Sequence, residues 1–131
     1  MSSPTPIPAT PHGDVVIRTI AMPAVANANG DIFGGWLVSQ MDLGGAILAR
    51  STALSRVTTV AIDAMSFIHP VCVGDTVSCY AHLVSIGRTS MKISVEAWVH
   101  RFTESTQQRV TAGLFTYVAI DNEGKPHPVK R

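Results

Sequence analysis

Charged residues are scarce in this sequence. Asp, Glu, Lys and Arg together make up 15% of its 131 residues, and 46% of the residues are hydrophobic, whereas the charged share of a typical domain is about 25%. So few charges cannot cover the whole surface of a domain, which predicts that part of this surface is buried between subunits. The formal net charge of +1 is too small to attract nucleic acid or an anionic membrane surface, and neither is expected as a partner.

Cysteine is also scarce, and no long apolar run is present. Cys72 and Cys79 lack the spacing of a zinc site, and the five histidines are scattered singly, so we predict no metal. The opening stretch MSSPTPIPATPHG lacks the basic start and apolar core of a secretory signal. The two cysteines are therefore expected to be reduced thiols of a cytoplasmic protein. No apolar run approaches the ~20 residues of a transmembrane helix.

The length of the chain fits one domain with a hydrophobic core and is too short for two of ordinary size. Four of the first eleven residues are proline, which favours an extended and poorly packed chain. We therefore predict a flexible arm over residues 1–12 and a single domain over residues 13–131.

One helix is predicted between segments with strand character. Residues 36–53 contain no proline, and their leucine, methionine, glutamine and alanine favour a helix despite two central glycines. β-Branched residues, or the alternation of apolar and polar side chains, indicate strands at 14–22, 57–68, 76–86, 91–99 and 110–120. This order predicts an α+β fold in which a five-stranded, mostly antiparallel sheet wraps one long apolar helix. The exposed sheet edges favour dimerisation through strands.

The run NANGDIFGGWLVSQMDLGGAILA contains a carboxylate, Asp42, among apolar and small residues. On a helix its neighbours three and four positions away are Val38, Ser39, Gly45 and Ala46, and none of them is a cation. Desolvation of a carboxylate is costly unless donors or a cation reach it from elsewhere in the fold or from a second subunit. Asp42 is therefore either a structural residue, bonded to a nearby backbone or reaching solvent, or a functional carboxylate.

The loop before the predicted helix offers backbone donors. Gly34 and Gly35 lie where the N–H groups of a first turn have no intrahelical partner and the helix dipole is positive. Because glycine lacks a Cβ, a substrate can approach these donors, and one of them contributes about 3 kcal/mol to stabilising an oxyanion. The alternative for the glycines, and for Asn27, Asn29 and Asp31, is a purely local turn. Free donors with a carboxylate about two turns further on would suit water attack on a carbonyl.

The same run, together with VTTVAIDAMSFIHPVCVGDTVSCYA, GRTSMKISVEAWV and FTYVAIDNEGKPHPV, resembles the YciA-type acyl-CoA thioesterases of the hotdog-fold superfamily over residues 14–129. The resemblance implies the hotdog fold, a sheet wrapped around one central helix. It implies hydrolysis of acyl-CoA to a free acid and CoA, with no cofactor because CoA is part of the substrate and product. It also implies a homodimer with active sites at the subunit interface, commonly assembled into a hexamer of three dimers.

Within the matched motif, the family's catalytic carboxylate falls on Asp42, its loop asparagine on Asn27 and its oxyanion-binding backbone on Gly35. The hypothesis is that Asp42 acts as a general base toward water, or attacks the thioester itself to form an anhydride. The sequence leaves both routes open. Asn27 would orient water or the carbonyl from the opposite subunit, while the Gly35 N–H stabilises the oxyanion.

The phosphates of CoA need cations or backbone donors. Each single cation has a plain alternative as a solvated surface charge. Thr59 is expected to pair with the pantetheine arm. The candidates for the phosphates are first Arg88, Thr89 and Ser90, in the GRTS turn, and second Lys130 and Arg131, at the end of the chain.

Two further functions stay open. His69 before Pro70 suggests an acyl-thioester hydratase or dehydratase, but its setting FIHPVCVGD lacks the pattern of that group, so His69 is expected to be a structural loop residue. A non-catalytic acyl-CoA binding or sensing module is the other alternative, although a sensor usually needs an output domain. Asp63 is a rival carboxylate, whose alternative role is a polar contact at a sheet edge or subunit interface.

Overall fold

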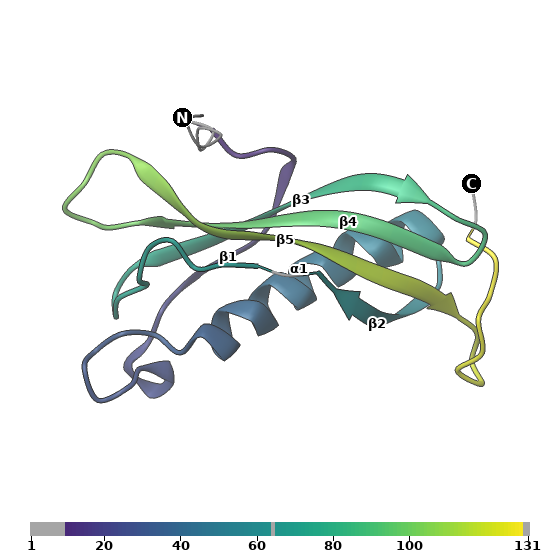
Figure 1. Ribbon diagram of the computed structural model, residues 1–131, viewed down its shortest axis with the longest axis horizontal. Helices are drawn as coiled ribbons and strands as arrows, with labels where there is room; N and C mark the ends of the chain where they lie inside the picture. Colours follow the sequence, from purple (N-terminus) through teal and green to yellow (C-terminus); the bar gives the residue numbers. More distant parts are fainter. Residues whose placement is uncertain (1–9, 64, 130–131) are drawn as a thin grey trace, which may run out of the picture.

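The structure, a computed structural model, describes residues 10–63 and 65–129. Within them one α-helix, α1 (Gly34–Ala53), follows a short 3-10 helix, η1 (Pro23–Val25). The strands are β1 (Asp14–Ile20), β2 (Arg56–Ile62), β3 (Thr76–Ile86), β4 (Ser90–His100) and β5 (Gln107–Ile120). Figure 1 shows the long strands β3, β4 and β5 running alongside α1.

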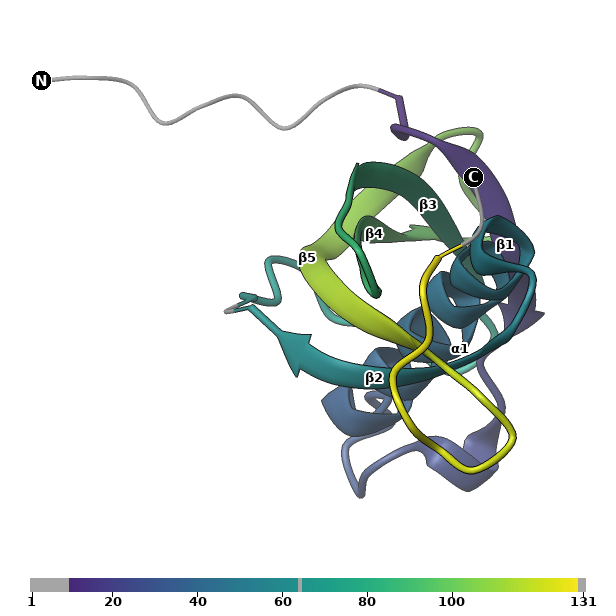
Figure 2. The ribbon, with the colours of Figure 1, turned by 90° about the vertical axis from the view of Figure 1, so that its right-hand side faces the viewer.

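The five strands form one antiparallel sheet in the order β1-β3-β4-β5-β2. β1 and β2 lie at opposite edges, so the helix that connects them has to cross one face of the sheet. Figure 2 shows the sheet curling around α1. The α+β fold predicted from the sequence, one long helix wrapped by five strands, is confirmed.

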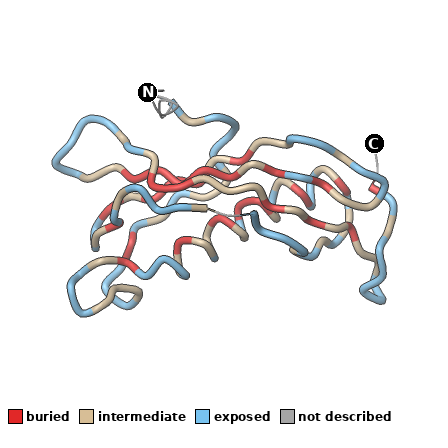
Figure 3. The backbone as a smooth tube through the Cα atoms, viewed as in Figure 1, coloured by how far each residue is buried: buried red, intermediate tan, exposed pale blue. Residues whose placement is uncertain are grey.

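The core lies between α1 and the concave face of the sheet. The predicted alternation along β4 places its odd-numbered side chains in this core, and Figure 3 shows the buried positions concentrated along the inner strands and on one side of the helix. The helix presents Leu37, Met41 and Ala49 to this layer. The buried side chains of β4 and β5 that belong to it include Met91, Ile93, Val95, Ala97, Phe115, Tyr117 and Ala119.

Several element boundaries differ from those predicted. α1 begins at Gly34 rather than at residue 36. The strand predicted over residues 57–68 ends at Ile62. Beyond it the chain stays beside β5, but it is joined to β5 by isolated hydrogen bonds and not by a regular strand ladder. The Thr111 hydroxyl donates to the Ser66 carbonyl at 2.8 Å, and the Ile68 N–H donates to the Val110 carbonyl at 2.8 Å. The β4–β5 register shifts beside Val110, and such an extra residue bends a strand away from regular pairing.

In the part of the chain that the structure describes, no helix is long and apolar enough to cross a bilayer. Most of the predicted N-terminal arm, and the two candidate cations Lys130 and Arg131, lie outside the described residues.

Candidate active site

Asp42 lies in the middle of α1, on the side that faces β2 and β5. The Thr59 hydroxyl of β2 donates a hydrogen bond of 2.6 Å to Asp42 Oδ1. The Tyr117 hydroxyl of β5 lies 3.1 Å from the same oxygen and 2.7 Å from the Asp42 main-chain carbonyl. These two hydroxyls are the donors that the helix itself does not provide. They donate to a half-buried carboxylate without placing a cation next to it.

The two carboxylate oxygens of Asp42 have different surroundings. Both hydroxyl contacts involve Oδ1, and no residue among 10–63 and 65–129 donates a hydrogen bond to Oδ2. One oxygen thus fixes the orientation of the side chain, while the other remains available to a ligand or a water molecule.

Tyr117 reaches Asp42 because residue 45 is a glycine. A Cβ at Gly45 would overlap the Tyr117 hydroxyl, and a Cβ at Gly44 would lie 2.8 Å from Val16 Cγ2 of β1. The Tyr117 side chain is fully buried, and this burial, followed by the charge of Asp42, raises the pKa of Tyr117 above its ordinary value. The phenol therefore stays protonated and can act only as a hydrogen-bond donor toward the carboxylate. The sequence pattern GG in a helix signals such a close approach but does not identify its partner.

The start of α1 leaves backbone donors free. Phe33 precedes the helix and provides no side-chain cap. The Trp36 and Leu37 N–H groups donate to the Phe33 carbonyl at 3.1 and 3.4 Å, whereas within the described chain the Gly34 and Gly35 N–H groups have no partner. Nothing lies within 4 Å of a Cβ built on Gly35. An acyl oxygen can therefore approach the Gly35 N–H, as an oxyanion donor requires.

The Asn27 side chain organises the loop that leads to α1. Its Oδ1 accepts hydrogen bonds from the Asn29 N–H at 2.9 Å and from the Asp31 N–H at 3.2 Å. This is the local turn that the sequence offered as an alternative role for Asn27. Because the oxygen is occupied, the part of Asn27 left for a ligand is the amide NH₂ group, which is a donor.

The structure brings together some of the predicted site residues and leaves others apart. Thr59 contacts Asp42, so its hydroxyl already has a partner, and the predicted pantetheine contact stays a prediction. Gly35 is seven residues from Asp42, which corresponds to about 10 Å along the helix. Asn27 makes no hydrogen bond with either residue. Tyr117, which contacts Asp42, is a site residue that was not predicted from the sequence.

The GRTS turn joins β3 to β4 and lies next to Val129, the last described residue. The Thr89 carbonyl accepts a bond of 2.8 Å from the Ala119 N–H, and the Arg88 carbonyl accepts one of 2.9 Å from the Val129 N–H. Arg88 is exposed, and Thr89 and Ser90 are half-buried. The chain continues from Val129 into the two cations that lie outside the described residues.

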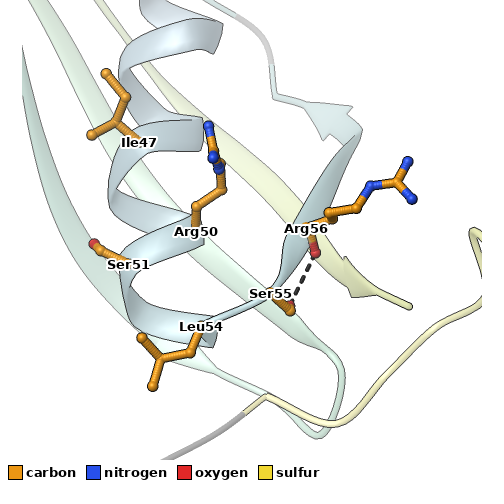
Figure 4. A pocket seen from close by; sticks show the side chains of 6 residues that line it. All are labelled: Ile47, Arg50, Ser51, Leu54, Ser55 and Arg56. Atoms are coloured by element: carbon orange, nitrogen blue, oxygen red, sulfur yellow. Dashed lines mark hydrogen bonds between the residues drawn. The ribbon is translucent and has the colours of Figure 1, made fainter. Parts of the chain in front are cut away.

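A large hollow lies at the C-terminal end of α1, away from Asp42. Its volume is about 510 Å³, and Arg50, Ser51, Leu54 and Arg56 are among its lining residues. In Figure 4 the Arg50 side chain runs back along the helix, whereas that of Arg56 points away from it. The two guanidinium groups thus do not converge on one point, and this hollow is not a paired arginine clamp.

The rival residues occupy less suitable places. Asp63 is exposed, and its N–H donates to the Leu114 carbonyl at 2.9 Å, so it sits at the end of an edge strand. His69 is half-buried and lines a small cavity beside the helix start. In the described chain, no carboxylate forms an ion pair with His69.

The chain matches the family model described as Thioesterase superfamily over residues 29–101. It is 58% identical over 119 residues to the acyl-CoA thioester hydrolase YciA of Escherichia coli (strain K12), an alignment that covers 88% of this chain and 90% of the relative. It is 56% identical over 123 residues to the acyl-CoA thioester hydrolase YciA of Salmonella typhimurium, with 92% of each chain covered.

Solved structures show the same similarity. The hexameric thioesterase y2039 from Yersinia pestis superimposes with a TM-score of 0.88 at 52% identity, covering 93% of this chain and 99% of that chain. The fold and the order of its elements are therefore shared along nearly the whole described chain.

Proposed function

The chain belongs to the thioesterase superfamily, with the hotdog fold and the activity of an acyl-CoA thioester hydrolase, and we propose that Asp42 is the carboxylate that drives the hydrolysis. The observation that carries this proposal is the asymmetry of its two oxygens. Thr59 and Tyr117 hold Oδ1, and Oδ2 is left to act on the substrate or on water.

Two routes use the same carboxylate. As a general base, Asp42 Oδ2 takes a proton from water while the water oxygen attacks the thioester carbonyl; the tetrahedral intermediate then expels the CoA thiolate, which receives the proton. As a nucleophile, Oδ2 attacks the carbonyl and expels the CoA thiolate, and water then hydrolyses the resulting anhydride. In both routes the products are a free carboxylic acid and CoA.

The oxyanion donor and the carboxylate of one site come, in this proposal, from two copies of the chain. The Gly35 N–H points away from the body of the helix, and an oxygen bound there is about 10 Å from Asp42 of the same chain. A water molecule held by a base reaches a carbonyl over only about 6 Å, the sum of a hydrogen bond and an attack distance. A single chain therefore cannot apply both groups to one carbonyl, and a dimer can.

Asn27 completes the proposed site from the same copy as Gly35. Asn27 lies in the loop that leads to α1, and Gly35 lies in the first turn of that helix. Its amide NH₂ group is the donor that would hold the attacking water or the carbonyl. The relatives whose names describe hexameric thioesterases support a homo-oligomer, and we propose three such dimers in a hexamer.

The CoA phosphates are proposed to bind at Arg88, Thr89 and Ser90. The support is the position of this turn beside the end of the described chain, where the sequence adds two further cations. Thr59 is then left with two proposed roles, orienting Asp42 and contacting the pantetheine arm.

The test is release of free thiol from acyl-CoA by the wild-type protein and by Asp42→Asn. Asn keeps the size of the side chain and removes the base and nucleophile, so kcat should fall by about 10²- to 10⁴-fold. Circular dichroism and thermal unfolding check that the variant is folded. An Asp42→Asn protein that folds normally and retains wild-type turnover would overturn the assignment.

A further inference from the structure

An apolar cavity of about 250 Å³ lies beside the start of α1. Its wall comes from four places in the sequence: the loop before the helix, the first turn of the helix, the segment after β2, and β5. Among the residues that line it are Ile32, Gly34, Leu37, Phe67, Val71 and Val110. Of all the residues that line it, His69 is the only one with a polar side chain. Such a wall favours a hydrocarbon over a phosphate or a nucleotide.

The cavity adjoins the proposed oxyanion donor. Gly34 forms part of its wall, and the N–H of the next residue, Gly35, is one of the free donors. A thioester carbonyl held by that N–H would lie one residue from this wall, within reach of the cavity for its acyl chain. The Phe67 ring lies next to Gly34, since its nearest atom would be 3.4 Å from a Cβ built on that residue.

We propose that this cavity binds the acyl chain of the substrate and that Phe67 limits the length of chain that it accepts. The proposal rests on the proposed thioesterase function and deepens it by naming a substrate class. Because an apolar cavity of about 150 Å³ accepts benzene, a ligand of six carbons, a cavity of 250 Å³ holds an acyl chain of up to about ten carbons. Short- and medium-chain acyl-CoA thioesters are therefore the preferred substrates, and longer chains extend past Phe67.

Phe67 and Val71 offer opposite changes to the cavity. Phe67 is 47% exposed, so its truncation opens the cavity without emptying the core. Val71 is 5% exposed and lies on the wall, so Val71→Leu adds one methylene group inside. Phe102 provides a matched control, because it is 88% exposed and follows β4 in the loop before β5, and Phe102→Ala makes the same chemical change away from the cavity.

The experiment measures kcat/KM for saturated acyl-CoA thioesters from two to sixteen carbons, with all four proteins checked for folding by thermal unfolding. One methylene group in a hydrophobic pocket is worth a factor of about 10 to 200 in specificity. In Phe67→Ala the ratio of kcat/KM for sixteen carbons to that for four should rise about tenfold or more. In Val71→Leu the ratio for ten carbons to two should fall by a similar factor, and Phe102→Ala should match the wild type.

Hydrolysis with the same length profile in all four proteins would overturn the cavity assignment and leave the proposed function intact. Absence of thiol release by the wild type at every chain length would overturn the proposed function, and this assignment with it. A length profile that shifts in Phe102→Ala as much as in Phe67→Ala would also overturn the role of Phe67.

Discussion

The Thr59 hydroxyl donates its hydrogen bond to Asp42 across the gap between β2 and α1, at 2.6 Å. This contact ties an edge strand of the sheet to the middle of the central helix. With Tyr117 on β5, it surrounds one oxygen of the carboxylate and leaves the other unbound. The direction in which Asp42 points is thus set by the sheet, so the proposed chemistry depends on packing between β2, β5 and α1.

Thr59 should act mainly through kcat if its role is to orient Asp42. Thr59→Val keeps the shape of the side chain and removes the donor, and a hydrogen bond to a charged group is worth about 1.5 to 3 kcal/mol. We expect kcat to fall about tenfold or more, with KM nearly unchanged, and Thr59→Ser to recover most of the loss. The measurement is steady-state thiol release over a range of acyl-CoA concentrations. A rise in KM at constant kcat would instead assign Thr59 to binding the pantetheine arm.

Gly45→Ala should destabilise the protein, because the new Cβ overlaps the Tyr117 hydroxyl. Overpacking of a core costs about 1 to 3 kcal/mol, and the free energy of urea unfolding should fall by that amount. The double variant with Tyr117→Phe should recover part of the loss, since the hydroxyl is gone while the ring remains near. Gly35→Ala is the control for stability, because nothing lies within 4 Å of its Cβ position. Equal unfolding free energies for Gly45→Ala and wild type would show that Tyr117 does not pack against Gly45.

The sequence predicted the fold well because the fold depends on periodicity. Strands β3 and β4 alternate apolar and polar residues with little interruption, and the long run after the loop contains no proline. The boundary at Ile62 was missed because residues beyond it keep a β-rich composition. Their departure from the ladder depends on the bulge in β5, and that register is a property of the paired strands together.

The site was only partly predictable, for a related reason. Asp42 was visible because a carboxylate among apolar residues needs a physical explanation. The partners that explain it, Thr59 and Tyr117, lie 17 and 75 residues away in sequence, and helical spacing reveals only neighbours on the same helix. The glycine at position 45 makes room for the Tyr117 hydroxyl, but the identity of that partner depends on the register of β5.

Cys79 should make the protein less stable in alkali. Its burial raises the pKa of the Cys79 thiol from 9.0 to about 12. The folded state then holds a proton that the unfolded state has lost, so this contribution to stability is complete below pH 9 and is lost as the pH rises toward 12. The slope from one such proton is at most about 1.4 kcal/mol per pH unit.

Urea unfolding between pH 8 and pH 11 measures this contribution. Cys79→Ala should have a shallower loss of unfolding free energy over that range than wild type. Parallel curves for wild type and Cys79→Ala would rule out a buried thiol as a source of the alkaline sensitivity.

Asn27→Asp should separate the two roles of Asn27. The carboxylate keeps the oxygen that accepts from the Asn29 and Asp31 N–H groups, so the loop and the thermal midpoint should change little. It removes the NH₂ donor and adds a negative charge, so thiol release should fall at least tenfold if that donor holds water or the carbonyl. Retained turnover would limit Asn27 to its structural role in the loop.

The same variant tests whether each site is built from two copies. If Asn27 and Gly35 of one copy work with Asp42 of another, a mixed dimer of Asn27→Asp and Asp42→Asn chains contains one doubly defective site and one site with every residue intact. Co-refolding the two defective chains should then restore thiol release, to about a quarter of the wild-type rate when half of the dimers are mixed and half of their sites are intact. If all three residues act within one chain, every site in the mixture keeps one defect and no activity returns. Since about 10 Å separates Gly35 from Asp42 along the helix, we expect restoration.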